Sequence, residues 1–286
     1  MAIDDFIPEI WHAEILSALQ KELVYGQLGV INKDYEGDIR DQGDTVHITS
    51  ISDVSVSTYT EHSTTLTYSA LTDTDTALLI DQAKSWTFKS GDIEERQAAG
   101  DFVTEASGRA AYGVADVIDQ YVASILYAAV NDTANDLGAK TADISDNTAY
   151  GNVLVALRTT LNRDNVPRQG RWVVVPAEFY GALLQDNRFV DASASADGGE
   201  ALRNGYIGRA LGFDIYESNN TPDPTTGTYA VIAGHPWACT FATQIMKAEA
   251  LRLEGAFATG YRGLAVYGGK VVRPTCLAMA SVTVQA

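Results

Sequence analysis

The sequence contains little cysteine and no long apolar segment. The two cysteines, Cys239 and Cys276, stand in apolar surroundings and form no CxxC pair. We therefore expect buried, reduced thiols that pack as small hydrophobic side chains. The N-terminus begins with acidic residues instead of the basic and apolar regions of a signal peptide. No window approaches the roughly 18 apolar residues of a transmembrane helix, so we expect neither a secretion signal nor a membrane span.

Basic residues are also scarce. The chain has 286 residues, with 20 Lys and Arg against 37 Asp and Glu, which gives a formal net charge of -17. Strong contact with DNA, RNA or an anionic membrane requires clustered Lys and Arg, so these partners are disfavoured. The acidic charge favours solubility, and it would also suit a surface beside nucleic acid that must not adhere to it.

One segment lacks Lys, Arg and Pro altogether, namely the stretch between Arg40 and Lys84. Ser and Thr dominate residues 49–76, and Val54–Ser57 and Leu66–Ser69 alternate apolar and polar side chains with the period of a strand. Such a segment can pair with itself but cannot bury a core of its own. The sequence therefore predicts an extended ribbon that reaches neighbouring molecules.

A helical pattern follows the ribbon. Asp92 and Glu95 have the spacing of a capping box, and apolar residues recur at intervals close to 3.6 residues up to about Val130. At 1.5 Å per residue this helix would be roughly 55–60 Å long, which exceeds the diameter of a small domain. Three glycines within the pattern indicate close helix packing or a kink: Gly100, Gly108 and Gly113.

From residue 146 onward, helical and strand patterns alternate. Asn152 to Leu161 has a helical period, Trp172–Val175 is typical of a buried strand, and Pro176 begins a second helix. These patterns predict a compact α/β module over about 146–245. The remainder of the chain is rich in strand patterns, and we expect it to pair with elements before residue 135.

No recognisable catalytic constellation occurs in the sequence. Gly255–Gly260 has the glycine spacing of a phosphate-binding loop, but Tyr261 stands where that loop requires lysine. The four histidines show no metal-ligand spacing, and there is no Gly-x-Ser-x-Gly elbow. Asp73 and Asp75 lack the other residues of a calcium loop, so a solvated turn is expected there. We therefore expect no enzyme, and no catalytic, cofactor-binding or metal-binding residues.

Four residues are candidate contacts between subunits. Trp11 lies on the apolar stripe of an N-terminal arm, whose partner surface belongs to this subunit or to the next one. Tyr59, His62 and Tyr68 lie in the ribbon. Aromatic side chains are frequent anchors at protein interfaces.

Eight short motifs occur in order along nearly the whole chain: Phe6–Trp11, Tyr35–Arg40, Gly43–Val46, Asn165–Pro167, Arg171–Pro176, Ser218–Asn220, Gly263–Gly268 and Val271–Pro274. In their order and spacing, they resemble the landmarks of the major capsid proteins of tailed bacteriophages. This resemblance implies an α+β chain with the Hong Kong 97-type capsid fold, also called the Johnson fold.

That fold has five parts, which the resemblance places along this chain. An N-terminal arm would cover 1–40, and an extended β loop would cover 41–90. A peripheral domain with a long spine helix would cover 91–145, and an axial domain would cover 146–245. The chain would return to the peripheral domain over 246–286.

The implied function is structural. Copies of the chain would form the hexamers and pentamers of an icosahedral shell that encloses phage double-stranded DNA in the virion, after assembly in the cytoplasm of the bacterial host. Three alternatives stay open: an encapsulin-like nanocompartment shell with the same fold, a phage tail protein, and an enzyme built on the α/β module. A nanocompartment would hold a cargo enzyme instead of DNA.

The resemblance also implies partners besides further copies of the chain. These are a separate scaffolding protein, a portal, a decoration protein and packaged DNA bound without sequence-specific contact, with no membrane involved. Some relatives cross-link their subunits through a lysine of the extended loop. Here the nearest lysines, Lys84 and Lys89, lie only at the base of that loop, so we expect no isopeptide cross-link.

Overall fold

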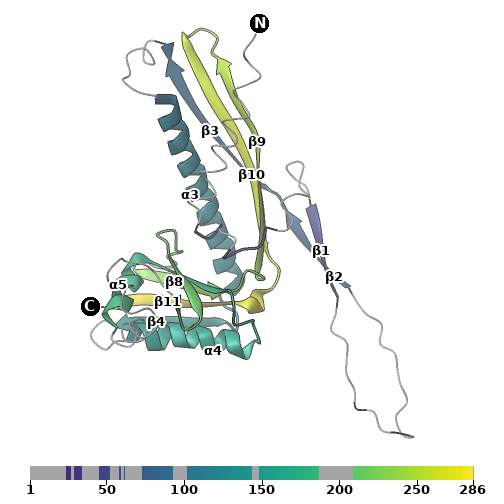
Figure 1. Cartoon of the computed structure of the whole chain (residues 1–286), viewed down its shortest axis with the longest axis vertical. Helices are drawn as coiled ribbons and strands as arrows, with labels where there is room; N and C mark the ends of the chain where they lie inside the picture. Colours follow the sequence, from purple (N-terminus) through teal and green to yellow (C-terminus); the bar gives the residue numbers. More distant parts are fainter. Residues whose placement is uncertain are drawn as a thin grey trace.

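The computed structural model is an L-shaped body from which a two-stranded ribbon projects (Figure 1). One limb contains a long helix beside a three-stranded sheet, and the other contains a six-stranded sheet with shorter helices. The structure describes residues 24–26, 29–33, 45–51, 58, 61, 73–92, 102–143, 148–186 and 209–285.

The upright limb is built on helix α3, Phe102–Val130. Its 29 described residues correspond to roughly 43 Å of helix. Beside it lies an antiparallel sheet with the strand order β3-β10-β9. The strands are β3 (Gln82–Gly91), β9 (Cys239–Arg252) and β10 (Ala258–Val271).

The apolar period of α3 explains this arrangement, because Val114, Ile118 and Leu126 recur on one face and are buried. The expected capping box is not tested, since Glu95 lies outside the described residues. Gly108 and Gly113 do not mark close packing among the described residues, because a Cβ added at either position would meet none of their atoms within 4 Å.

The second limb is a mixed sheet with the order β4-β11-β8-β5-β7-β6. Both faces of β5 are covered, so all five of its residues are buried, as the run Trp172–Val175 predicts. The strands are β4 (Asp136–Asp143), β5 (Arg171–Val175), β6 (Arg209–Ala210), β7 (Phe213–Glu217), β8 (Thr228–Gly234) and β11 (Leu277–Gln285). The short helices are η2 (Ala149–Val155), α4 (Ala156–Arg163), α5 (Ala177–Gln185) and η3 (Pro274–Cys276).

The last strand departs from the expected course of the chain. Strands β9 and β10 join β3 in the upright limb, as expected, but β11 lies between β4 and β8 in the six-stranded sheet. By their pairing, β4 and β11 belong with the strands of the expected axial module. This sheet therefore crosses the expected boundaries at 145 and 245, and the five-part domain division itself stays a prediction.

The base of the ribbon pairs with itself, as the sequence predicts. Strands β1 (Thr45–Ile51) and β2 (Asp73–Leu79) are antiparallel over their whole length. Their buried side chains form a small second cluster with the upright sheet: Ile48, Leu78, Ile80, Ala242 and Val266. The expectation of a solvated turn at Asp73 and Asp75 is wrong, because both residues lie in β2 and His47 Nδ1 of β1 is 2.5 Å from Asp75 Oδ2.

Candidate assembly surfaces and the junction that orients them

A buried carboxylate joins three segments that are far apart in the sequence. Asp119 on α3 is 2% exposed. Its Oδ1 accepts hydrogen bonds from the backbone N–H groups of Val24 at 2.9 Å and Tyr25 at 2.7 Å. Its Oδ2 accepts one from the side-chain amide of Asn220 at 3.1 Å. The carboxylate thus fixes the N-terminal segment and the loop after β7 to the same point of the spine helix.

The same amide also binds a second carboxylate. Asn220 Nδ2 donates to Asp116 Oδ1 at 2.8 Å, so two acidic residues one turn apart on α3 share one donor. Burial raises the pKa of the Asp119 carboxyl, and the hydrogen bonds from Asn220 and from the N-terminal backbone oppose that rise. Asp119 is therefore a costly group to bury, and its donors offset that cost.

The loop that carries Asn220 is held by its own hydrogen bonds. The backbone N–H of Ser218 donates to Val175 O at 3.0 Å, which extends the pairing with β5 beyond the end of β7. Ser218 Oγ accepts the N–H of Asn220 at 3.1 Å, and Thr221 Oγ1 donates to Ser218 O at 2.9 Å. The Ser218–Asn220 motif is therefore a fixed turn that directs the side-chain amide of Asn220 toward the two carboxylates on α3.

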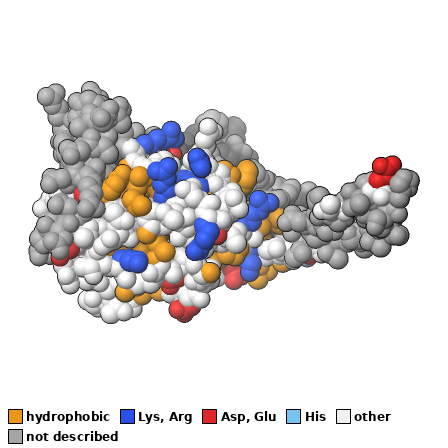
Figure 2. Space-filling view, turned by 90° about the horizontal axis from the view of Figure 1, so that it is seen from below, with side chains coloured by type: hydrophobic (Ala, Val, Ile, Leu, Met, Phe, Trp, Pro, Cys, Tyr) orange, Lys and Arg blue, Asp and Glu red, His pale blue; other side chains and the backbone are white. Residues whose placement is uncertain are grey.

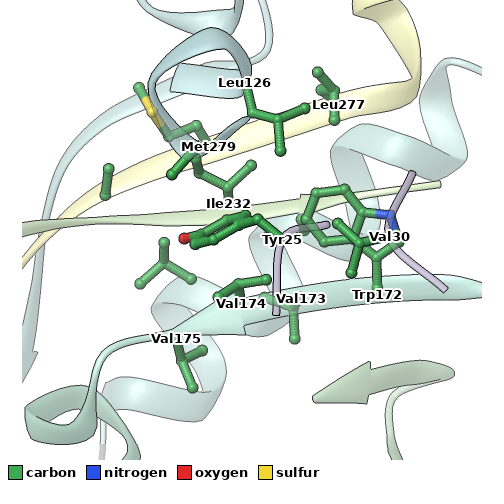
Figure 3. Packing of buried hydrophobic residues seen from close by; sticks show 14 of the residues in the cluster. Tyr25, Val30, Leu126, Trp172, Val173, Val174, Val175, Ile232, Leu277 and Met279 are labelled. Atoms are coloured by element: carbon green, nitrogen blue, oxygen red, sulfur yellow. The ribbon is translucent and has the colours of Figure 1, made fainter. Parts of the chain in front are cut away.

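Apolar packing supports this polar junction. Tyr25 and Val30, which lie within the expected N-terminal arm, are completely buried among side chains of the six-stranded sheet and of α3 (Figure 3). Their neighbours in this view include Leu126, Trp172 and Val174. The base of the arm, the spine helix and the six-stranded sheet thus share one hydrophobic core, which sets the angle between the two limbs.

The far end of the upright sheet carries exposed apolar side chains. Phe257, in the connection between β9 and β10, is 86% exposed, and Leu251 and Leu253 are 42% and 38% exposed. The connection is tied to the end of β3, because Arg252 binds the Asp92 carboxylate and the Asp92 N–H donates to Phe257 O at 3.0 Å. The strand pattern in the sequence did not indicate this apolar tip, because it does not show which residues the turn exposes.

The four predicted contact residues, Trp11, Tyr59, His62 and Tyr68, lie outside the described residues. Their role in assembly stays a prediction. Three of them, Tyr59, His62 and Tyr68, lie in the sequence between β1 and β2. These two strands extend away from the body (Figure 1).

The predicted buried thiols are confirmed. Cys239 and Cys276 are free and buried. Burial raises the pKa of the Cys239 thiol to about 12 and also raises that of Cys276. Within the described parts of the chain, no group of three or more His, Cys, Asp or Glu residues could hold a metal ion.

The spine helix is more apolar than the sequence analysis expected. Among the described residues, one helical segment, Ala106–Val130, is long enough and apolar enough to cross a membrane. Its many alanines raise the average hydropathy without forming a continuous run of large apolar side chains. Much of it is buried against the two sheets, and Asp119 within it is hydrogen-bonded, as in the core helix of a folded body.

The model of a known family, described as phage capsid protein, matches residues 91–280, which is more than half of the chain. The chain belongs to the phage capsid protein family. The matched residues include α3, strands β9 and β10 of the upright sheet, most of the six-stranded sheet, and both Asp119 and Asn220. Among curated proteins, no sequence matches this chain.

Solved structures agree with this assignment. A chain from Mycobacterium phage Che8 is 32% identical, with a TM-score of 0.73 over 98% of this chain and 94% of that chain. The capsid structure of the cyanophage P-SCSP1u is 16% identical, with a TM-score of 0.70 over 92% and 89%. A virus-like particle from Pyrococcus furiosus shares the fold at 12% identity, with a TM-score of 0.57 over 96% and 100%.

These matches confirm the fold and the function that the sequence motifs imply. The capsid protein has the Hong Kong 97-type fold and is a structural major capsid protein of a bacteriophage. The likeness to the Pyrococcus particle shows the fold alone, so a cellular nanocompartment is the less supported assignment.

Proposed function

We propose that copies of this capsid protein assemble into the hexamers and pentamers of an icosahedral shell that encloses phage double-stranded DNA. The observation that carries the proposal is the ribbon. Its base is anchored to β9 and β10 through a small apolar cluster, while its strands lead away from the body that would otherwise cover them (Figure 1). We expect the ribbon beyond this base to gain its contacts from another molecule.

The junction at Asp119 supports the same proposal. A closed shell needs subunits that meet at a defined angle, and many modest contacts then add up through multivalency. The shared core and the bonds from Asn220 and Tyr25 to Asp119 hold the two limbs at one angle. The exposed Phe257 tip provides a further apolar contact at the end of the upright limb.

The proposed partners follow from the family and from the charge. We expect assembly in the bacterial cytoplasm with a separate scaffolding protein and a portal, and decoration proteins on the finished shell. The net charge of -17 suits an inner surface along which packaged DNA slides without sequence-specific contact. This expectation requires more acidic than basic side chains on the inner surface of the shell.

A ribbon deletion tests the proposal. The described ladder between β1 and β2 ends at the pair Ile51 and Asp73, so residues 52–72 can be replaced by Asn-Gly, which closes a two-residue hairpin. We expect this variant to fold, to keep the melting temperature of the unassembled wild type, and to form no closed shells in electron micrographs. Normal shells from the variant would show that the distal ribbon has no role in assembly.

The content of the particles decides between the two shell functions. Shells recovered from phage-infected cells should contain double-stranded DNA that nuclease cannot reach. Shells that instead retain a host enzyme and no DNA would establish the nanocompartment alternative.

A further inference from the structure

The charge of the capsid protein is distributed unevenly along the chain. Residues 1–147 hold 26 of the 37 acidic residues but only 8 of the 20 Lys and Arg. Residues 148–286 hold the other 11 acidic and 12 basic residues. The C-terminal half is therefore close to neutral in a chain whose net charge is -17, and its basic residues are available for contact with acidic surfaces.

Several of these basic residues gather near the start of β5. Arg171 is buried and donates from Nε to Pro167 O at 2.8 Å and from Nη2 to Val166 O at 2.7 Å, which fixes the loop before the strand. Arg158 on α4 and Arg168 in that loop are near enough to lower the pKa of the Arg171 guanidinium, although burial lowers it more. Three arginines thus lie together.

An exposed tryptophan continues this cluster. The His235 ring lies 3.6 Å from the position of a Cβ at Gly170 and packs edge-on against Trp237, with 4.9 Å between the ring centroids. Trp237 is 54% exposed, and the Arg273 guanidinium lies 5.8 Å from its ring centroid. We call Arg158, Arg168, Trp237 and Arg273 the arginine–tryptophan edge.

Among the described residues, the arginines of this edge lack ionic partners. In the described part of the chain, no carboxylate lies within ion-pair distance of Arg158, Arg168 or Arg273. The carboxylate of Asp164 already has other partners, because it accepts a hydrogen bond from the Asn135 amide at 2.7 Å and lies 3.8 Å from Arg163 Nε. Arg and Trp are the residue types most enriched among the strong contributors to protein interfaces.

The margin of the molecule at α4, the helix that carries Arg158, is rich in basic side chains. Figure 1 views the molecule down its shortest axis, and α4 lies at the lower margin. Seen from that margin, Lys and Arg side chains are spread over the surface and outnumber Asp and Glu (Figure 2). In a shell one subunit thick, the broad faces meet the interior and the exterior, and a narrow margin meets a neighbour.

We propose that the arginine–tryptophan edge binds the acidic N-terminal half of a second copy of the capsid protein. This inference rests on the proposed shell function and adds the surface and the charge pattern by which neighbours recognise each other. A basic edge on one half of the chain and an acidic surplus on the other half favour head-to-tail contacts over contacts between like halves. Packaged DNA would also attract arginines, so it is the competing partner that the test below must exclude.

Charge reversal at two exposed edge residues tests the proposal. The variant Arg168→Glu/Arg273→Glu is compared with Arg209→Glu/Arg262→Glu, which changes the net charge equally at exposed positions of the C-terminal half outside the edge. The readout is the concentration of subunit left unassembled at low salt, measured by sedimentation. We expect at least a tenfold rise for the edge variant and less than a twofold rise for the control variant. An equal rise in both would attribute the effect to net charge and overturn the proposal.

Two further measurements keep the test decisive. Circular dichroism and thermal unfolding of the unassembled variants establish that they are folded, and Trp237→Ala should also reduce assembly although it changes no charge. Raising the salt concentration should increase the unassembled fraction of the wild type but not of the edge variant, because salt screens exposed charges.

The outcomes distinguish a failure of this proposal from a failure of the proposed shell function. If the wild type forms shells and the folded edge variant assembles equally well, the edge has no role and only this proposal fails. If the variant assembles normally but loses binding of short double-stranded DNA at low salt, the edge binds nucleic acid and the proposal is also wrong. If the wild type forms no shells with scaffolding protein present, the shell function itself fails.

Discussion

The carboxylate of Asp119 is the most sensitive point of the fold. Replacing it with alanine removes the acceptor for the backbone N–H groups of Val24 and Tyr25, which lie 2.9 and 2.7 Å from Oδ1. It also removes one of the two acceptors of the Asn220 amide. Asn220 keeps Asp116, but the buried N–H of Tyr25 and the partly buried N–H of Val24 both lose this acceptor.

The expected cost follows from those two groups. A buried donor without a partner costs about 1–3 kcal/mol, and removing a costly buried charge offsets part of the loss. We therefore expect Asp119→Ala to lower the free energy of unfolding by about 3 kcal/mol. For a chain of this size, that loss corresponds to a decrease of roughly 6–12 °C in melting temperature.

The measurement is denaturant and thermal unfolding of the unassembled subunit, with Asp116→Ala as the matched control. Asp116 is one turn away, is only partly buried and accepts the same Asn220 amide at 2.8 Å. Its removal should cost less than about 1 kcal/mol, because the amide keeps Asp119. An Asp119→Ala variant within 1 kcal/mol of the wild type, or an equal loss in both variants, would refute the role assigned to this carboxylate.

The same residue gives a pH dependence of known sign. Burial raises the pKa of Asp119, so the native state holds this proton up to a higher pH than the unfolded chain does. The free energy of unfolding of the wild type therefore decreases as the pH rises from the ordinary pKa of an Asp carboxyl through the raised pKa of Asp119. The Asp119→Ala variant has no carboxyl at this position and does not show that decrease. The difference in stability between the two proteins should be largest at the acidic end of this window and should narrow as the pH rises.

Three other predictions concern packing, thiols and covalent links. A Cβ at Gly263 would overlap the Trp86 indole, so Gly263→Ala should cost about 1–3 kcal/mol in thermal unfolding, and much less in a Trp86→Ala background. Because burial raises the pKa of Cys239 to about 12, neither cysteine should react with a thiol reagent at neutral pH until denaturant is added; rapid reaction of the native protein would contradict the buried site. Shells boiled in detergent should give single-chain bands, and a covalent ladder would disprove the absence of cross-links.

The elements with strong local patterns were predictable from the sequence. The run Trp172–Val175 is apolar on both faces, and it forms the fully buried β5. The period of Val114, Ile118 and Leu126 corresponds to the buried face of α3. In these segments, burial is decided by the residue types themselves, so local spacing is enough.

Long-range pairing and the junction were not predictable. Strand β11 pairs parallel with β4 and antiparallel with β8, and nothing in the sequence of Leu277–Gln285 distinguishes those partners from β3. Asp119 falls on the buried stripe of α3, between Ala115 and Val122, but the sequence does not show that Tyr25 and Asn220 arrive from distant segments to donate to its carboxylate. The ordered motifs identified the family, but their resemblance could not show what each residue contacts.

Electron microscopy of the purified capsid protein, with and without a co-expressed scaffolding candidate, tests the central claim most directly. Our account predicts closed icosahedral shells or capsomer rings of five and six subunits. Uniform monomers in both samples would contradict shell assembly and return attention to the six-stranded module as a binding domain or an enzyme.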